Sequence, residues 1–321
     1  MKLLKNEKDL EKTGFFQKKT MILTLILIIV LVGCQTAVTE PKINTDNKIE
    51  GMEILKMGLI PADDADEMLR NYEPIKKYLS AELGIPVEIQ VTSDYTAAIE
   101  AMRAKHIDMA WFGPFSYVIA ANVAGAEAIV NGVKESTGSA TYKSLIIVNK
   151  DSGIEKLEDL KGKTFAFVDP ASTSGNLIPR KMLIENGINP DVDFSTTFYA
   201  GTHNAVQYAI ANGKVDAGAS GDNVYQRMVE SGEINSEVNI IIHESEPIPG
   251  SPIVVRGNLP TEIKQKIQNV LINMDQQTIH KVDGWGGISS YQKVSDSDYN
   301  VIRETAKLLG MDVSNAEAAN K

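Results

Sequence analysis

The sequence predicts an α/β fold of two lobes, in which each lobe is a mostly parallel sheet with flanking helices and two crossover strands form a hinge. A chain of 321 residues with 43% hydrophobic content is long enough to bury two cores. Strand and helix patterns alternate from residue 54 and again from residue 143, which is typical of parallel sheets covered on both faces. The proline-dense segment 247–252 then precedes an apolar strand pattern that returns to the first lobe. Two crossings leave a cleft that hinge motion can close.

The first lobe opens with strand and helix patterns in turn. Residues 67–83 place apolar side chains at helical spacing, and Gly84 follows as a stop signal. Ser93 and Asp94 precede the next helical pattern and are typical cap residues. We expect strands at 54–60, 87–91 and 109–112, and helices at 67–83, 95–104 and 116–124.

The second lobe repeats this rhythm. A strand pattern at 143–149 is expected to lead out of the first lobe. We expect further strands at 165–168, 194–199, 217–220 and 239–243, a helix after each of the first three, a short helix at 157–162, and closing helices at 261–274 and 297–309. These elements divide the chain into lobe 1, residues 52–145 and 247–321, and lobe 2, residues 146–246.

Residues 1–33 have the pattern of a lipoprotein signal peptide. Two lysines precede an apolar run, 21–32, that is too short to span a bilayer comfortably. The run ends in Leu-Val-Gly-Cys34, which resembles the lipobox of bacterial lipoproteins, so Cys34 is the predicted lipidation site. The alternative is a buried strand with a chance cysteine, but the N-terminal position behind lysines favours the signal. Residues 34–51 are polar and aperiodic, which predicts a flexible tether.

Charge and motif content exclude several classes of function. The formal charge is −10, and the six lysines and three acidic residues of 1–33 leave about −13 for the rest of the chain, which argues against a nucleic-acid partner. A single cysteine excludes a disulfide within the chain. The sequence lacks the usual zinc-protease, redox, serine-hydrolase and phosphate-loop motifs. It therefore predicts no metal site, no cofactor and no enzyme.

The turn at residues 169–175 is the strongest candidate for a binding site. Three hydroxyl residues and a glycine stand there between an apolar strand and a helical pattern. The first N–H groups of a helix lack internal partners and carry the positive end of its dipole, so such a turn suits a compact oxyanion. The alternative is an ordinary helix cap. Pro179 removes a backbone donor near the first turn, so we expect the helix to begin loosely or bend there.

Five separated motifs together resemble the phosphonate-binding proteins of ABC transporters, which have the type 2 periplasmic-binding-protein fold. The resemblance covers about residues 57–285, with its motifs in the right order, and therefore favours a ligand turn over a plain cap. It implies an extracytoplasmic receptor that captures a phosphonate, phosphite or related oxyanion and delivers it to a permease. The motifs are Asp94-Tyr-Thr-Ala97, Asp108-Met-Ala-Trp-Phe-Gly-Pro-Phe-Ser-Tyr117, 169–175, Ala200-Gly-Thr-His203 and Pro247-Ile-Pro-Gly250.

The resemblance also implies which residues contact the ligand. Tyrosine, serine and threonine hydroxyls donate hydrogen bonds without adding charge, and a protonated histidine would add a charge-assisted bond. Each residue also has a structural alternative as a cap, rim or core side chain. The implied ligand contacts are Tyr95, Tyr142, Ser172, Thr173, Ser174 and His203, with Ser116 as a weaker candidate.

Two positions differ in their implications for an amine-bearing ligand. Relatives that bind aminoalkylphosphonates pair carboxylates with the ligand ammonium, and the nearest matches here are Asp222 and Ser251. The serine departs from the pattern, which disfavours an amine and favours phosphite, methylphosphonate or phosphate. Asp222 would then accept a hydrogen bond from a protonated ligand oxygen and reject sulfate, or serve only as a helix cap.

The receptor reading has two rivals from other classes. A sensor module would use the same cleft to signal to a membrane kinase, and an extracytoplasmic enzyme would turn over phosphate esters. The enzyme is disfavoured because the four histidines, at 106, 203, 243 and 280, are scattered. The expected partners are a small phosphorus oxyanion, a permease and, through the lipid on Cys34 alone, the cell membrane. Receptors of this fold are usually monomers.

Overall fold

The computed structural model describes residues 49–279 and 287–314, which belong to one compact unit, 43–321. The predicted signal peptide, Cys34 and most of the predicted tether lie outside the described residues. Within the described ranges, no helix combines the length and hydrophobicity needed to cross a membrane.

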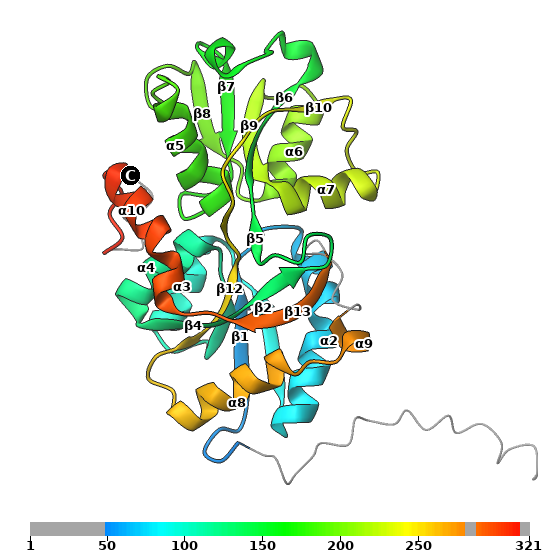
Figure 1. Cartoon of the computed structure of the whole chain (residues 1–321), viewed down its shortest axis with the longest axis vertical. Helices are drawn as coiled ribbons and strands as arrows, with labels where there is room; N and C mark the ends of the chain where they lie inside the picture. The colour runs from blue at the N-terminus through cyan, green and yellow to red at the C-terminus, as the bar shows by residue number, and fades with distance from the viewer. Residues whose placement is uncertain (1–48, 280–286, 315–321) are drawn as a thin grey trace, which may run out of the picture. The chain divides into compact units, whose positions relative to one another are not determined.

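Lobe 1 is built on a six-stranded sheet with the order β13-β4-β12-β3-β1-β2 (Figure 1). Parallel pairing joins β1 to both β2 and β3, whereas β12 pairs antiparallel with β3 and β4, and β13 pairs antiparallel with β4. The strands are β1 (Leu55–Leu59), β2 (Val87–Val91), β3 (Met109–Trp111), β4 (Ala126–Lys134), β12 (Pro252–Arg256) and β13 (Ile288–Lys293). The helices are α2 (Ala65–Leu83), α3 (Tyr95–Arg103), α4 (Pro114–Ala124), α8 (Thr261–Ile272), α9 (Gln276–Ile279) and α10 (Asn300–Leu308).

Lobe 2 is built on a five-stranded sheet with the order β10-β6-β9-β7-β8. Strand β7 pairs parallel with β8 and β9, and β6 pairs antiparallel with β9 and β10. The strands are β6 (Ser144–Asn149), β7 (Thr164–Phe167), β8 (Thr196–Tyr199), β9 (Ala217–Gly221) and β10 (Asn239–Glu244). The helices are a π-helical turn (Thr173–Leu177), α5 (Ile178–Glu185), α6 (His203–Ala211) and α7 (Asp222–Glu230). Lobe 2 also has short 3₁₀ turns at Lys150–Ser152 and Leu157–Leu160, and lobe 1 has one at Asp296–Tyr299.

The two sheets are mixed rather than mostly parallel. The strands joined by helices are parallel, as the sequence predicts, but β6 and β12 each enter a sheet from the other lobe. A strand that arrives from the opposite direction can pair with its neighbours only in the antiparallel sense. The crossings that create the hinge therefore also create the antiparallel pairs of β6 and β12, and β13 adds a further antiparallel pair with β4 inside lobe 1.

The crossover itself lies earlier than the predicted strand at 143–149. Strand β6 belongs wholly to the lobe 2 sheet, and the chain passes between lobes at β5 (Thr141–Tyr142) and β11 (Ile248–Pro249). These two segments pair antiparallel, with Tyr142 opposite Ile248. Figure 1 shows them running side by side between the green upper lobe and the lower lobe. The hinge is thus a two-stranded ribbon.

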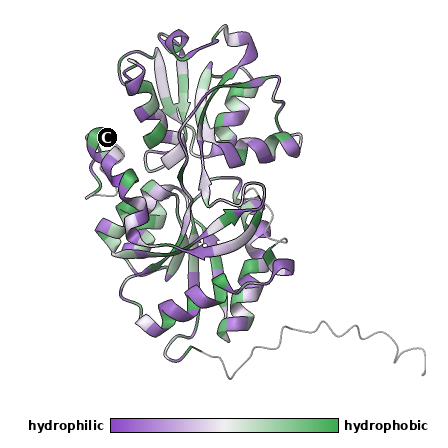
Figure 2. Ribbon diagram, in the orientation of Figure 1, coloured by the Kyte–Doolittle hydropathy of each residue, from purple (hydrophilic) through white to green (hydrophobic). Residues whose placement is uncertain are grey.

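The strands of both lobes carry the hydrophobic core. Figure 2 shows hydrophobic residues concentrated along the sheets and on the helix sides that face them. One buried cluster continues from lobe 1 into lobe 2, with Ile60 and Phe115 on one side and Leu145, Ala166 and Val206 on the other. The two lobes therefore pack against each other in this structure.

Two strands of the lobe 1 sheet were not predicted. Strand β4 contains Gly132 and small or polar residues, and β13 contains two serines, so neither has the apolar run typical of a strand. Strand β4 forms because it pairs with β12 on one side and with β13 on the other, and β13 forms because it pairs with β4. Gly132 is required there, since a Cβ atom would lie 2.7 Å from the Ile288 side chain.

Candidate functional site

The turn after β7 adopts an unusual helical start. The Ser172 hydroxyl accepts a hydrogen bond from the Gly175 N–H at 3.1 Å and so caps a π-helical turn that leads into α5. Pro179, at the start of α5, has no N–H to bond the carbonyl four residues earlier. That carbonyl, of Gly175, instead accepts from the Val168 N–H at 3.0 Å. The predicted irregularity is confirmed, and it ties the turn to the end of the strand.

Glycine at position 175 is a steric requirement. A Cβ atom there would lie 2.3 Å from the Val168 side chain and 2.9 Å from the Ser172 hydroxyl. The turn is thus packed directly onto the strand that precedes it, and its hydroxyls are held in fixed positions.

Five helical N-termini meet at a small cavity between the lobes, here called the central pocket. Besides the 172–174 turn, the first residues of α3, α6 and α7 and the cap of α4 line it. Its volume is about 30 Å³, room for a group of a few heavy atoms. The lining residues are Ile60, Ala62, Tyr95, Trp111, Gly113, Tyr142, Ser172, Thr173, Ser174, His203, Asn223, Val224 and Ser251.

The pocket offers hydroxyl donors rather than charged side chains. Tyr95 is 2% exposed, its hydroxyl is within reach of Ser172, and burial raises its pKa well above the usual range. Burial likewise raises the pKa of Tyr142, whose hydroxyl contacts those of Ser174, Thr173 and Ser251. Both phenols therefore stay protonated and can donate hydrogen bonds. Among the residues that line this pocket in the described chain, none carries a formal charge once His203 is neutral.

Burial favours the neutral form of His203 in this structure, so its ring offers a neutral donor and not the charge-assisted bond that a protonated imidazole would add. Burial lowers its pKa to about 4. Its Nδ1 accepts a hydrogen bond from the Gly221 N–H at 3.3 Å and lies 3.0 Å from the Ser220 hydroxyl. An accepting Nδ1 leaves the proton on Nε2. The ring therefore supplies one neutral N–H donor instead of a charge.

Two of the predicted positions lie outside the central pocket. Ser116 is fully buried on α4 and donates to the Gly113 carbonyl at 3.0 Å, so its hydroxyl is used within the helix turn. Asp222 pairs with Lys134, whose Nζ lies 3.2 Å from both carboxylate oxygens. The next residue, Asn223, lines the pocket in its place.

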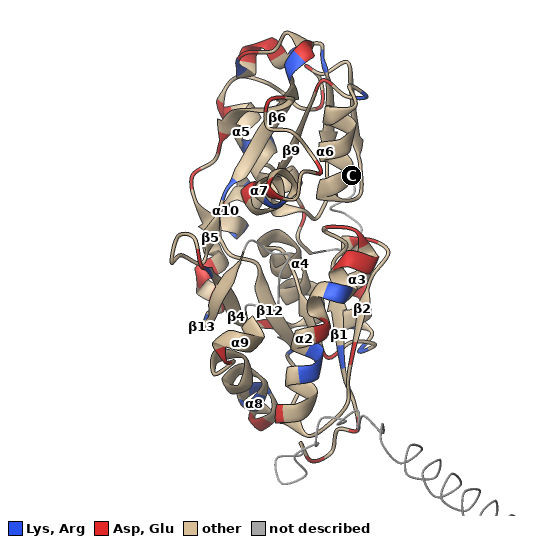
Figure 3. Ribbon diagram, turned by 90° about the vertical axis from the view of Figure 1, so that its right-hand side faces the viewer, with Lys and Arg blue, Asp and Glu red and all other residues tan. Residues whose placement is uncertain are grey.

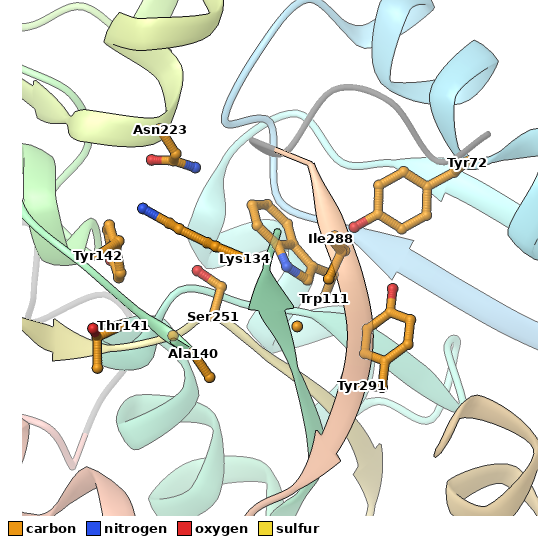
Figure 4. Close-up of a pocket in the computed structure, with 12 residues that line it drawn as sticks. Tyr72, Trp111, Lys134, Ala140, Thr141, Tyr142, Asn223, Ser251, Ile288 and Tyr291 are labelled. Atoms are coloured by element: carbon orange, nitrogen blue, oxygen red, sulfur yellow. The ribbon is translucent and has the colours of Figure 1, made fainter. Parts of the chain in front are cut away.

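Sequence reasoning missed Trp111, Asn223 and Lys134. Trp111 ends β3, so the rule that ligands gather at the carboxyl ends of strands could have identified it. Lys134 lies on the unpredicted β4 and lines a second cavity, here called the side chamber (Figure 4). The side chamber adjoins the central pocket and has a volume of about 60 Å³. Its lining residues are Tyr72, Trp111, Gly132, Lys134, Ala140, Thr141, Tyr142, Asn223, Gly250, Ser251, Ile288 and Tyr291.

Direct contacts hold the two lobes together around the pocket. The Phe115 N–H donates to the Thr173 hydroxyl at 2.8 Å, and the His203 N–H donates to the Ala62 carbonyl at 3.1 Å. The same turn and helix also line the pocket, so the contacts that join the lobes also shape the pocket.

An arginine on α7 adds an ionic contact across the lobes. Arg227 pairs with Asp63 and, at 3.1 Å, with Glu67, both from lobe 1. Its side chain is 12% exposed and that of Asp63 is 5% exposed. Figure 3 shows acidic and basic residues interspersed over both lobes. The group of Arg227 with Asp63 and Glu67 is therefore distinguished by its buried position between the lobes and not by an unusual local charge.

Two buried carboxyl groups at the lobe boundary destabilise the folded protein at neutral pH, where they are ionised. Burial raises the pKa of Asp63 to about 6, outweighing the attraction of Arg227. Burial also raises the pKa of Asp169 to about 6, although the N–H groups of Ala171 and Tyr95 donate to its carboxylate. As the pH falls, the folded chain takes up these protons before the unfolded chain does. Their contribution to stability is therefore largest below about pH 4 and is lost as the pH rises through 6.

Asp169→Asn is expected to reduce the gain in stability between pH 7 and pH 5. The change removes the buried charge and its titration, which are together worth about 1–3 kcal/mol of unfolding free energy. Denaturant unfolding at the two pH values measures the effect. Asp151→Asn, at an exposed position, is the matched control and should leave the pH dependence unchanged. An unaltered pH dependence in Asp169→Asn would show that this carboxyl does not titrate between pH 5 and pH 7.

The arrangement suits a small ligand rich in hydrogen-bond acceptors. Hydroxyls, helix N-termini and a neutral imidazole, all of which can donate hydrogen bonds, line one cavity. In the described ranges, no group of three or more histidine, cysteine or acidic side chains is arranged to hold a metal ion.

Comparison with known proteins agrees with this geometry. Residues 57–299 match the family described as "ABC transporter, phosphonate, periplasmic substrate-binding protein". The chain is 30% identical to the phosphate-import protein PhnD of Mycolicibacterium smegmatis, over 80% of this chain and 86% of that one. It is also 30% identical to the phosphonates-binding periplasmic protein of Escherichia coli, over 80% of this chain and 77% of that one.

A solved structure supports the same assignment. The binding protein component of an ABC phosphonate transporter from Pseudomonas aeruginosa has a TM-score of 0.74 and 28% sequence identity, over 84% of this chain and 89% of that one. These relatives are transport binding proteins rather than enzymes, and the family is extracytoplasmic. The two α/β lobes, the pocket between them and the matches together show that this chain belongs to the periplasmic substrate-binding proteins of ABC phosphonate transporters.

Proposed function

We propose that the central pocket binds the PO₃ or PO₄ group of a small phosphorus oxyanion, which the chain delivers to its permease. The convergence of helical N-termini and buried hydroxyls carries this proposal, because these groups stabilise an anion without a neutralising cation. The proposed ligand contacts are Tyr95, Tyr142, Ser172, Thr173, Ser174, His203 and Ser251, with Asn223 added from the structure.

The favoured ligands are phosphite, methylphosphonate and phosphate. Ser251 lines the pocket where an acidic residue would serve an ammonium group, and Asp222 is engaged by Lys134. The relatives differ among themselves, since one is named for phosphate import and another for phosphonates. Hydroxyls accept as well as donate, so they can also pair with a protonated ligand oxygen, which sulfate lacks at neutral pH.

Isothermal titration of the purified protein at pH 7 tests the ligand class. We expect micromolar or tighter binding of at least one of phosphite, methylphosphonate and phosphate, and sulfate binding at least tenfold weaker because sulfate offers no proton to the hydroxyl oxygens. Absence of binding to all three phosphorus oxyanions would overturn the proposal.

Tyr95→Phe and Tyr142→Phe should each weaken binding of the best ligand. Each change removes one hydrogen bond to a charged group, worth about 1.5–3 kcal/mol, or roughly a tenfold to 150-fold rise in Kd. Titration of both variants measures this loss. Tyr208→Phe is the control, because the Tyr208 hydroxyl donates to Glu233 away from the pocket. Unchanged affinity in both pocket variants would remove these tyrosines from the site.

The remaining proposals concern how the receptor is held and divided. We propose that the mature protein is a lipid-anchored monomer that begins at Cys34, supported by the lipobox-like sequence around the sole cysteine.

We also propose lobe boundaries of 52–145 with 247–321, and 146–246. Membership of β12 in the lobe 1 sheet supports the second boundary, whereas β6 (Ser144–Asn149) lies wholly in the lobe 2 sheet and favours a first boundary just before residue 144.

Cys34→Ser is expected to release the protein from the membrane, because serine cannot carry the thioether-linked lipid. Fractionation of cells that produce the full chain should place the wild-type protein with membranes and the variant in the soluble fraction. A variant that stays with the membranes would contradict lipidation at this cysteine.

A further inference from the structure

The side chamber and the central pocket share part of their walls. Trp111, Tyr142, Asn223 and Ser251 line both cavities. These shared residues place the chamber next to the position that the oxyanion group of a ligand would occupy in the central pocket. With a volume of about 60 Å³, the chamber is larger than the central pocket, so the space for a substituent is already present in the closed structure.

Most of the chamber wall is apolar or aromatic. Figure 4 shows Tyr72, Trp111 and Tyr291 with Ile288 grouped on one side. Tyr72 is 2% exposed and Tyr291 is 7% exposed, so these rings belong to a dry wall. Burial of an alkyl group against such a wall is favourable.

The opposite corner carries a balanced ion pair. Lys134 on β4 reaches across the lobes to Asp222 on α7, with its Nζ 3.2 Å from both carboxylate oxygens. The lysine side chain is 17% exposed and the aspartate side chain is 30% exposed. In Figure 4 the ammonium end of Lys134 points toward Tyr142 and Asn223.

This pair determines how a charged substituent would be received. Of the residues lining the chamber, all within the described chain, Lys134 alone is charged, and none is acidic. A ligand ammonium would therefore meet a like charge, and Lys134 already compensates the nearby carboxylate of Asp222. An uncharged alkyl group meets neither obstacle.

We propose that the side chamber receives the substituent on phosphorus and that Lys134, by pairing with Asp222, selects short uncharged alkyl groups over ammonium-bearing ones. This inference rests on the proposed function of the central pocket. It assigns a specificity role to Lys134, a residue that sequence patterns did not single out.

The test compares ethylphosphonate with 2-aminoethylphosphonate, which differ by the amine, in titrations at pH 7. The wild-type protein should bind ethylphosphonate at least tenfold more tightly. Lys134→Met should reduce this preference at least tenfold, because the carboxylate of Asp222 then becomes available to the ligand ammonium. The preference is the readout because loss of a contact between the lobes would weaken both ligands alike.

Three further variants separate charge from packing. Lys134→Met combined with Asp222→Asn should restore the preference for ethylphosphonate, since the carboxylate is gone. Asp222→Asn alone should leave the lysine uncompensated and improve binding of phosphonoacetate relative to ethylphosphonate. Lys264→Met is the matched control, because Lys264 is 15% exposed and pairs with Glu127 away from both cavities. It should leave every preference unchanged.

Methylphosphonate and phosphite separate the two levels of failure. If either binds to the wild-type protein but the two ethyl ligands bind equally, or if Lys134→Met leaves the preference unchanged, the role of Lys134 is wrong while the proposed function stands. If no phosphorus oxyanion binds to the wild-type protein, the proposed function is overturned and this inference with it.

Discussion

The convergence of five helical N-termini on one cavity between the lobes is the constraint on which this site depends. Several of the first N–H groups at these ends are held by acceptors in the protein, as Gly175 is by Ser172 and Phe115 by Thr173, and these bonds fix the ends around the cavity. The Ser172 cap, the π-helical turn and the missing donor of Pro179 hold one of them against its strand. The compact, acceptor-rich ligand proposed above matches the donors that line this cavity.

The proposed anion site lies in a chain of net negative charge, but its own lining carries no acidic side chain. The chain has a formal charge of −10, yet the central pocket is lined by neutral donors, including an imidazole whose Nδ1 is already occupied. Partial charges that the fold holds in place can stabilise an anion without a counter-charge. Water would be excluded from them when the lobes close. The contacts of Arg227 and of Lys134 cross from one lobe to the other in this structure, so they stabilise the arrangement in which the pocket is formed.

Local sequence signals predicted most elements and the ligand turn. Helix 67–83 and the hydroxyl turn were recognisable because period, caps and glycine positions are properties of neighbouring residues. Strands β4 and β13 escaped because their residues have weak intrinsic strand preference and form a ladder only with each other and β12. Lys134 escaped with β4, and the distinction between Asp222 and Asn223 depends on how α7 begins.

By itself, the sequence determined the α/β class, the alternation of strand and helix, and the chemistry of the 172–174 turn, since each is encoded within a few consecutive residues. Only the tertiary structure decided that the sheets are mixed, that His203 is neutral, and that Lys134 meets a carboxylate 88 positions away. Burial and long-range pairing set those outcomes, and neither can be read from the residues next to them.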